Sequence, residues 1–347
     1  MTEADYLNDN LEEEIMLRCM YSGISGMKVN QQKLDVIGNN IANVGTTAFK
    51  SSRAEFSDML YQSSESASSP TSTKGGTNAK QVGLGAKLSS IDKVMSQGNA
   101  LSTGRTLDVC VDGDGYLIVG SGSITGSNGI TDNAFTESGG TTGDAEALDI
   151  LYTRDGNLKL DYQGNLLTSD GYRVMGYNVG GALTHSEDGI TAQFVSADDT
   201  NALTTDDTLV PLAIPDKVGD QSVSSFEIGK DGLIIAILGD GTRSVLGQIA
   251  MANFKNPEGL TGIGGNMYQI SSNSGEAIIK SAIDKTDDGA DNSKSFGDIV
   301  QGCLEASNVD LTEQFTDMIT ATRSFQAASK MITTGDEILQ TITGLMR

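Results

Sequence analysis

The sequence predicts a β-rich antiparallel central domain flanked by long N- and C-terminal α-helices that pair as a coiled coil on assembly. Both ends of the chain carry apolar residues at alternating three- and four-residue steps, the spacing of a coiled-coil helix. The middle carries repeated Asp-Gly pairs between apolar runs, which are typical of β-hairpin turns. With 347 residues, the chain is long enough for two or three domains of about 150 residues each.

These patterns also predict the domain boundaries. We expect paired helices over residues 16–45 and 302–347, an extended arm or linker over 46–100, a β domain over 101–180 and 222–299, and a short insertion over 181–221. Residues 1–15 hold six acidic residues and no Lys or Arg, and are treated as an acidic extension.

The N-terminal helix is predicted from a heptad-like apolar stripe that is suited to packing against another helix. Its seam consists of Leu17, Met20, Ile24, Met27, Leu34, Ile41 and Val44. An amphipathic helix lying on its own domain is the alternative interpretation of the same stripe.

The C-terminal helix is predicted from the same alternation over about five heptads, longer than most helices within a single domain. Its seam consists of Leu311, Phe315, Met318, Phe325, Ile332, Leu339 and Met346. Residues 17–44 have a net charge of +2 and residues 304–346 a net charge of −4, which favours pairing one helix with the other over self-pairing.

Between the helices the composition changes twice. Residues 62–81 are rich in Ser, Thr and Gly, which indicates a linker or an extended arm. From about residue 101 onward, Asp-Gly pairs such as 231–232 and 240–241 separate apolar runs. The run Leu233 to Leu238 lies between these two pairs and is predicted to be a strand buried on both faces.

Composition excludes several classes of function. Lys and Arg total 23 against 46 Asp and Glu, and the net charge of −23 argues against binding to nucleic acid or to an anionic membrane surface. No stretch of the sequence approaches the apolar length of a membrane span, and no cleavable secretory signal is visible. On composition alone, the chain would be placed in the cytoplasm.

The sequence contains no recognisable catalytic or cofactor-binding constellation. His185 is the one histidine, and we expect it to be an exposed bystander in a polar loop. The run Asp112 to Gly115 fails the calcium-loop pattern, because Tyr116 and Leu117 occupy positions that need a ligand and a glycine. The three cysteines lie far apart and are expected to pack as small hydrophobic residues. A cross-link between subunits through a cysteine is left open.

Segments at both ends resemble the signatures of flagellar rod and hook proteins. The N-terminal signature covers residues 20–26, 34–44 and 48–51, and the C-terminal one covers 305–311, 324–326 and 336–339. Its marker residues are Asn39, Asn40, Asn43, Phe49, Lys50, Asn308 and Asp310. Segments 75–78, 81–85, 102–108 and 113–115 look like the hook members of this family.

The resemblance implies a structural subunit of the flagellar hook, the tubular flexible joint between rod and filament, without enzymatic activity. Members of this family leave the cell through the flagellar type III export apparatus without a cleaved signal, and they polymerise into a tube. The resemblance therefore implies a location in the flagellar basal body or hook, outside the cell, instead of the cytoplasm. The implied partners are further copies of the chain in a helical homopolymer, rod and hook–filament junction proteins, the hook cap and the export apparatus. The two seams would pair in the inner wall of the tube, and Asn39, Asn40 and Asn43 would lie at the turn out of the helix.

Two features depart from the hook pattern. Tyr177 and Phe226 are too close in sequence to hold a large outer domain, so a distal rod subunit is the alternative to a hook subunit. The signature begins at Met16, and residues 1–15 are therefore interpreted as a start-site artefact. From a different class, a secreted Gly-rich enzyme or adhesin remains a remote alternative.

Overall fold

The computed structural model describes residues 3–72, 74–122, 128–131, 134–135, 148–186, 189–197, 203–283 and 292–345. The chain divides into two compact units. The helical unit comprises Met1–Val44, Ser51–Val94 and Val309–Arg347, and the β unit comprises Gly45–Lys50 and Met95–Asn308. Over their described residues, neither long helix is apolar enough to cross a membrane.

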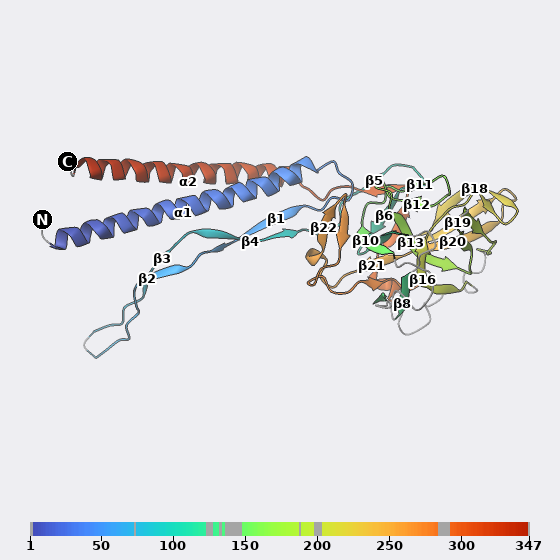
Figure 1. The fold of residues 1–347 in the computed structure, drawn as a ribbon, viewed down its shortest axis with the longest axis horizontal. Helices are drawn as coiled ribbons and strands as arrows, with labels where there is room; N and C mark the ends of the chain where they lie inside the picture. Colours follow the sequence, from blue (N-terminus) through green and yellow to red (C-terminus); the bar gives the residue numbers. More distant parts are fainter. Residues whose placement is uncertain are drawn as a thin grey trace. The chain divides into compact units, whose positions relative to one another are not determined.

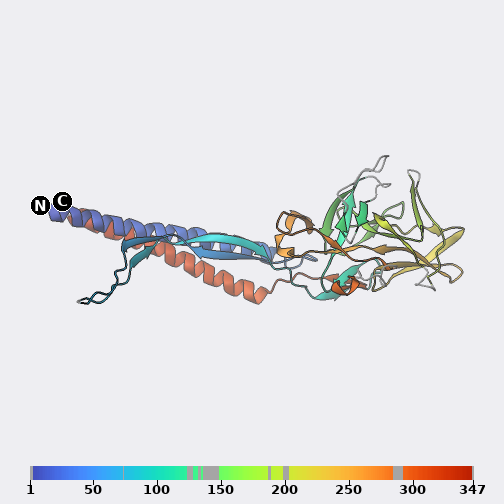
Figure 2. The same cartoon turned by 90° about the horizontal axis from the view of Figure 1, so that it is seen from below.

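The helical unit contains two long antiparallel helices, α1 (Glu3–Ala42) and α2 (Leu311–Leu345) (Figure 1). Beside α1 lie two antiparallel strand pairs, which form one long hairpin-like excursion (Figure 2). β1 (Ser52–Asp58) pairs with β4 (Ala86–Lys93), and β2 (Tyr61–Glu65) pairs with β3 (Lys80–Gly83).

The expected arm over residues 46–100 thus contains two paired β ladders. Cross-strand apolar neighbours support it, with Ala54 opposite Ile91 and Phe56 opposite Leu88. These strands were not predicted because their sequence is rich in Ser and Thr and has few large apolar residues. The backbone hydrogen bonds of the ladder are made without burying many large side chains.

The β unit is built almost entirely of short strands. Its first strands are β5 (Ala100–Ser102), β6 (Val109–Asp112), β7 (Tyr116–Ser121), β8 (Asn128–Thr131), β9 (Ala134–Phe135), β10 (Asp149–Thr153), β11 (Lys159–Leu160), β12 (Leu166–Leu167), β13 (Arg173–Val179), β14 (Leu183–Ser186) and β15 (Gly189–Ala192). The chain continues through β16 (Thr205–Pro211), β17 (Lys217–Val218), β18 (Gln221–Ile228), β19 (Leu233–Leu238), β20 (Arg243–Ile249), β21 (Met251–Asn253), β22 (Thr261–Gly264), β23 (Met267–Gln269), β24 (Ile278–Ile279), β25 (Asp298–Gln301) and β26 (Cys303–Glu305). Strands β7 to β24 are connected in one branched sheet system, while β25 pairs with β6 and β26 with β5.

The core of the β unit lies on both faces of its central strands. In β7, Leu117 and Val119 join one buried cluster, whereas Tyr116 and Ile118 join a second. Alternate side chains of a strand point to opposite faces, so β7 separates the two clusters. The predicted strand over residues 233–238 is β19, and its Asp-Gly turns contain glycines with φ values of 85° at Gly232 and 81° at Gly241.

Residues 181–221 are part of the same β unit rather than an insertion beside it. β16 pairs with β13, placing Leu209 opposite Tyr177, and Leu183, Ala192 and Leu209 are buried. The sequence suggested a short insertion here because these strands are short and each supplies only one or two core side chains between polar neighbours.

His185 lies on β14 and is half-buried, so the expectation of an exposed loop residue was also wrong. Its Nε2 is buried without a hydrogen-bond partner among the described residues. Burial disfavours the charged imidazolium and lowers the pKa of His185, and the nearby positive charge of Arg173 acts in the same direction.

His185 therefore predicts an acid-sensitive contribution to stability. Because its folded pKa is lowered, the unfolded chain binds more protons between that value and about 6.5, and stability falls as the pH decreases through this window. A His185→Gln variant should lose less unfolding free energy than the wild type between about pH 7.5 and 5, by no more than about 1.4 kcal/mol per pH unit. Urea denaturation at the two pH values measures the difference, and parallel pH profiles would contradict the assignment.

Candidate functional site

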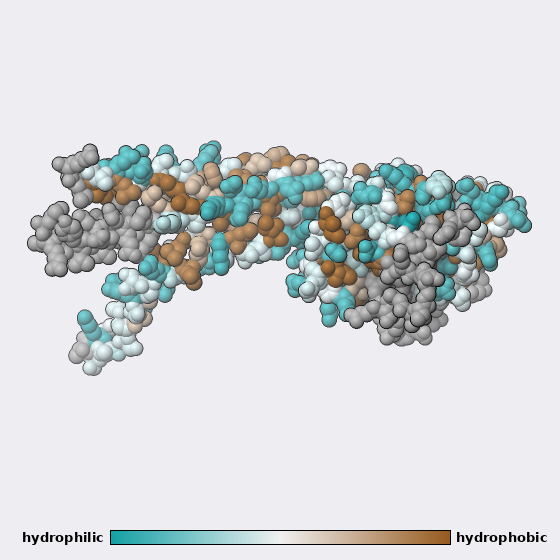
Figure 3. Space-filling model, viewed as in Figure 1, coloured by the Kyte–Doolittle hydropathy of each residue, from teal (hydrophilic) through white to brown (hydrophobic). Residues whose placement is uncertain are grey.

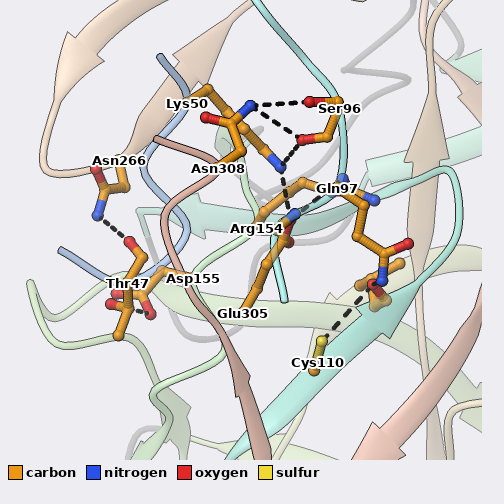
Figure 4. A network of polar contacts seen from close by, with 12 residues as sticks. Thr47, Lys50, Ser96, Gln97, Cys110, Arg154, Asp155, Asn266, Glu305 and Asn308 are labelled. Carbon is orange, nitrogen blue, oxygen red and sulfur yellow. Dashed lines mark hydrogen bonds and ion pairs between the residues drawn. The ribbon is translucent and has the colours of Figure 1, made fainter. Parts of the chain in front are cut away.

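Lys50 and Glu305 meet in the β unit where the chain enters it and leaves it. Lys50 Nζ donates to Glu305 Oε1 at 2.6 Å, and both side chains are fully buried (Figure 4). Lys50 Nζ also donates to the carbonyl oxygen of Ser96 at 2.8 Å. Glu305 is the last residue of β26, whose pairing with β5 joins the two ends of the long 95–308 segment. The ion pair thus fixes the short 45–50 segment to this closing ladder.

Arg154 adds a second buried cation beside the same carboxylate. Its Nη1 lies 3.6 Å from Glu305 Oε1, and its Nε donates to the carbonyl of Gly115 at 2.9 Å. The guanidinium also donates to the carbonyl of Gly113 and lies 5.5 Å from the centre of the Tyr116 ring. Arg154 therefore links the turn before β7 to the Glu305 carboxylate.

The two carboxylate oxygens of Glu305 differ in their hydrogen bonding. Its Oε1 also accepts a hydrogen bond from the Gly98 backbone N–H at 2.8 Å, whereas Oε2 has no hydrogen-bond partner among the described residues. A Cβ atom at Gly98 would lie 2.0 Å from the Ala306 carbonyl oxygen, so this close approach requires glycine. Burial lowers the pKa of Lys50, and the charge of Glu305 opposes this shift.

Backbone hydrogen bonds also hold Ala48 and Phe49 of the entering segment. The Ala48 N–H donates to the Glu305 carbonyl at 2.8 Å, and the Asn308 N–H donates to the Phe49 carbonyl at 3.4 Å. The Asn308 side-chain amide donates to Ser96 Oγ at 3.1 Å. Two of the predicted signature residues, Lys50 and Asn308, are therefore brought together with the half-buried Phe49.

A second group of contacts anchors Thr47. Thr47 Oγ1 donates to Asp155 Oδ1 at 3.1 Å, and the Asn266 amide donates to the Thr47 carbonyl at 2.8 Å. Burial raises the pKa of Asp155, partly opposed by hydrogen bonds from the Asn157 N–H and from Thr47. Glu305, Arg154 and Asp155 were not predicted from the sequence as site residues. Glu305 is the first residue of the C-terminal signature, and this position could have indicated the site.

The remaining signature residues shape the ends of the helices within the helical unit. Asn40 is 1% exposed; its amide donates to the Ser52 carbonyl and to Gln314 Oε1, and its Oδ1 accepts from the Ser52 N–H. One asparagine therefore joins α1, β1 and α2. The Asn43 amide donates to the carbonyl and the side-chain oxygen of Asn39, both at 2.9 Å, at the end of α1.

The ends of both helices differ from the predicted boundaries. α1 ends at Ala42, so Val44 lies in the following turn. α2 begins at Leu311 rather than at residue 302, because 303–305 form β26. Asp310 Oδ1 accepts from the Thr312 N–H at 2.8 Å, and this N-cap starts the helix.

Small residues make the closest contacts between α1 and α2. A Cβ at Gly23 would lie 3.2 Å from Ile332 Cγ1, and one at Gly335 would lie 3.2 Å from Met20 Cγ. On α2, Ala321, Ala328 and Gly335 are buried at seven-residue intervals. These residues carry little hydrophobic signal, so the sequence analysis selected their apolar neighbours instead, although the regular spacing was visible.

The predicted seam residues occupy several environments. Ile24 faces the β1–β4 hairpin and is 37% exposed, and Leu311 and Phe315 are 39% and 50% exposed. The half-buried members are Met20, Met27, Leu34, Ile41, Val44, Met318, Phe325, Ile332 and Leu339. The Leu17 side chain and Met346 lie outside the described part of the chain. The role of these residues in assembly stays a prediction.

The cysteines differ in exposure. Cys110 is buried in β6, and desolvation raises the pKa of its thiol to about 11, so the unreactive protonated form dominates at neutral pH. Cys303 is half-buried and Cys19 is exposed. Within the described residues, no group of His, Cys, Asp and Glu side chains is arranged to hold a metal ion.

The ion pair predicts unequal effects of removing each partner. Glu305→Gln leaves two buried cations without a carboxylate and should destabilise the fold by about 3–5 kcal/mol. Lys50→Met should cost less, because Arg154 still faces Glu305. The double variant should be more stable than the sum of the single effects predicts. Urea denaturation followed by tyrosine fluorescence measures all three, since the chain has no Trp.

The control for this cycle is Glu55→Gln, which breaks the exposed pair of Arg53 and Glu55 and should change stability by less than about 1 kcal/mol. Strictly additive effects of the Lys50 and Glu305 substitutions would show that the buried pair is not coupled.

The helix contact predicts opposite effects at two glycines of α1. Gly23→Leu should force the helices apart and lower the temperature at which the helical signal melts, because its Cβ meets Ile332. Gly38→Ala should raise that temperature, since nothing lies within 4 Å of a Cβ there and the exchange stabilises a helix by about 1 kcal/mol. Thermal melts followed by circular dichroism at the helical band test both. Equal behaviour of the two variants would contradict the close α1–α2 contact.

Three family models match separate parts of the chain. The flagella basal body rod protein family matches residues 20–50, the flagellar hook protein FlgE/F/G D1 domain matches 144–236, and the flagellar basal body rod FlgEFG protein C-terminal family matches 300–345. A solved structure, the flagellar hook protein FlgE2 of Helicobacter pylori, covers 59% of this chain and is itself covered completely, with a TM-score of 0.39 and 10% identity. That likeness is too low to carry an argument.

Full-length relatives agree with the family models. The flagellar basal-body rod protein FlgG of Bacillus subtilis is 42% identical over 332 residues, covering 96% of this chain and all of the relative. The flagellar hook protein FlgE of Borreliella burgdorferi is 30% identical over 460 residues, covering 95% of this chain and all of the relative. FlgG of Caulobacter vibrioides is 32% identical over 332 residues, covering 95% and 99%. The chain belongs to the flagellar rod and hook protein family.

Proposed function

We propose that the chain is a structural subunit of the distal rod in the flagellar basal body. The length of the alignments carries this proposal. Rod relatives align over 332 residues, whereas the hook relatives of Borreliella burgdorferi and Treponema pallidum need 460 and 475 residues to cover the same 95–96% of this chain. The hook relatives thus contain long segments that have no counterpart here.

The β unit supports the same choice. Strands β14 to β17, which occupy the short insertion expected over residues 181–221, belong to the central sheet system. Val218 is 1% exposed and Leu212 fully buried, so the described residues of this region contribute to the common core of the β unit.

A hook subunit is the second candidate. The Borreliella hook relative matches nearly the full chain at 30% identity, and residues 75–78 and 81–85 resemble hook members. In either case the function is mechanical. Copies of the chain polymerise with one another, and rod and hook–filament junction proteins, with the hook cap in the hook case, lie at the ends of the polymer. The chain is exported through the type III apparatus without a cleaved signal.

Deletion of the gene separates the two candidates. Basal bodies from the deletion strain should show a shortened rod without its distal part, and expression of the wild-type chain should restore it. Electron microscopy of purified basal bodies measures rod length directly. A full-length rod that lacks only the hook would favour the hook subunit, and an intact rod with an intact hook would contradict both.

A further inference from the structure

The chain passes between its two compact units at four peptide bonds. These linking bonds follow Val44, Lys50, Val94 and Asn308, so the β unit is entered and left through the short segment 45–50 and through the two ends of the segment 95–308. A force that travels along the chain from one unit to the other must cross these bonds. The residues beside them therefore decide how such a force is distributed over the β unit.

Hydrogen bonds join the segments beside three of the linking bonds to one another (Figure 4). Lys50 Nζ donates to the Ser96 carbonyl at 2.8 Å and to Glu305 Oε1 at 2.6 Å. The Asn308 amide donates to Ser96 Oγ at 3.1 Å, and the Asn308 N–H donates to the Phe49 carbonyl at 3.4 Å. Lys50, Ser96 and Asn308 each lie within two residues of a linking bond. Three passages of the chain are thus tied together by one cluster of contacts.

The centre of this cluster is shielded from water. The side chains of Lys50 and Glu305 are fully buried, and the Gly98 N–H also donates to Glu305 Oε1 at 2.8 Å. A hydrogen bond is stronger in the low dielectric of a protein interior than in water. Water also has little access to replace a partner that is pulled away. The cluster is therefore suited to hold the three passages together under load.

Hydrophobic side chains gather on the surface of the helices and of the adjoining hairpin (Figure 3). They include Tyr21, Leu60 and Ile319, which are 66%, 81% and 61% exposed. Under the proposed function, neighbouring copies in the polymer cover such side chains. A force from a neighbour then acts on the helical unit and reaches the β unit through the linking bonds.

We propose that the cluster of Lys50, Ser96, Glu305 and Asn308 is a mechanical clamp, which shares a force arriving from the helical unit among the chain segments that enter the β unit. Contacts loaded in parallel resist a force that would break them one after another, so the clamp prevents single strands from being peeled off the β unit. This role depends on where the force is applied, which distinguishes it from stabilisation of the fold alone. The inference rests on the proposed function, because a rod or hook subunit is under mechanical load.

Single-molecule force spectroscopy on the full chain applies a load to the clamp. In a background without Cys19 and Cys303, one cysteine handle replaces Gly75, in the exposed loop between β2 and β3. The other replaces Tyr162, which is 90% exposed in the β unit. Both strands of the hairpin then carry the force to the linking bonds that follow Lys50 and Val94.

Removing the clamp should speed the opening of the β unit in this direction of pulling. At constant force, Lys50→Met and Glu305→Gln should each raise the opening rate at least about tenfold, since forced unfolding follows the unfolding rate. Asn308→Ala removes the amide that reaches Ser96 and should raise the rate about threefold. This milder variant leaves the buried pair intact, so it tests the clamp even where a variant of that pair fails to fold.

A second direction of pulling separates the clamp from stabilisation alone. Handles at Tyr162 and at the exposed Asp240 apply the force within the β unit, without crossing a linking bond. Lys50→Met should change the opening rate here by less than about twofold. Leu246→Ala, which creates a cavity in the buried core, should raise it and so serves as the control.

Two results would overturn the clamp. One is acceleration by Lys50→Met of similar size in both directions of pulling, and the other is the absence of acceleration by Lys50→Met and Asn308→Ala when the force enters at Gly75. Neither result bears on the proposed function. That function is contradicted instead by an intact rod with an intact hook in the deletion strain.

Discussion

The buried ion pair of Lys50 and Glu305 is the constraint on which the arrangement of the β unit depends. A lysine removed from water is costly unless its charge is matched, and here the match is made at 2.6 Å within fully buried side chains. Lys50 can reach Glu305 only when residues 45–50 lie along the β26 end of the unit. The pair therefore specifies one path for the entering segment, while hydrophobic burial elsewhere supplies most of the stability.

The two units differ in how completely they bury their apolar residues. The β unit has buried clusters on both faces of β7 and closes its own ends through the β5–β26 and β6–β25 ladders. The helical unit has a narrow contact of glycine and alanine, and leaves Tyr21, Leu60 and Ile319 between 61% and 81% exposed. Large exposed apolar side chains in such numbers are typical of surfaces that are covered in an assembly, which agrees with the function proposed for the chain.

The sequence predicted the two helices and the β character of the middle because both depend on local periodicity. The strand over residues 233–238 with its Asp-Gly turns needs no information from distant residues. Contacts between distant residues were not accessible in this way. Glu305 and Lys50 are 255 positions apart, and Arg154 joins them only through the folded sheet. Ala321 and Ala328 were overlooked because small residues matter through the close approach they allow, which hydrophobicity does not measure. His185 and the 181–221 strands were misjudged because single buried side chains between polar neighbours give no clear period.

A chain with a net charge of −23 must overcome its own repulsion in order to polymerise. At physiological ionic strength, charges separated by more than about 8 Å are largely screened, so the overall charge weighs less than the groups that meet at a contact. Local charge then decides which surfaces can approach. Lys28 of α1 and Lys87 of β4 line an apolar groove of the helical unit, where they offset part of the acidic charge of the chain. Apolar burial at a contact supplies attraction that salt does not screen. A strongly acidic subunit can in this way be repelled by most surfaces of its own copies and still associate where apolar side chains meet.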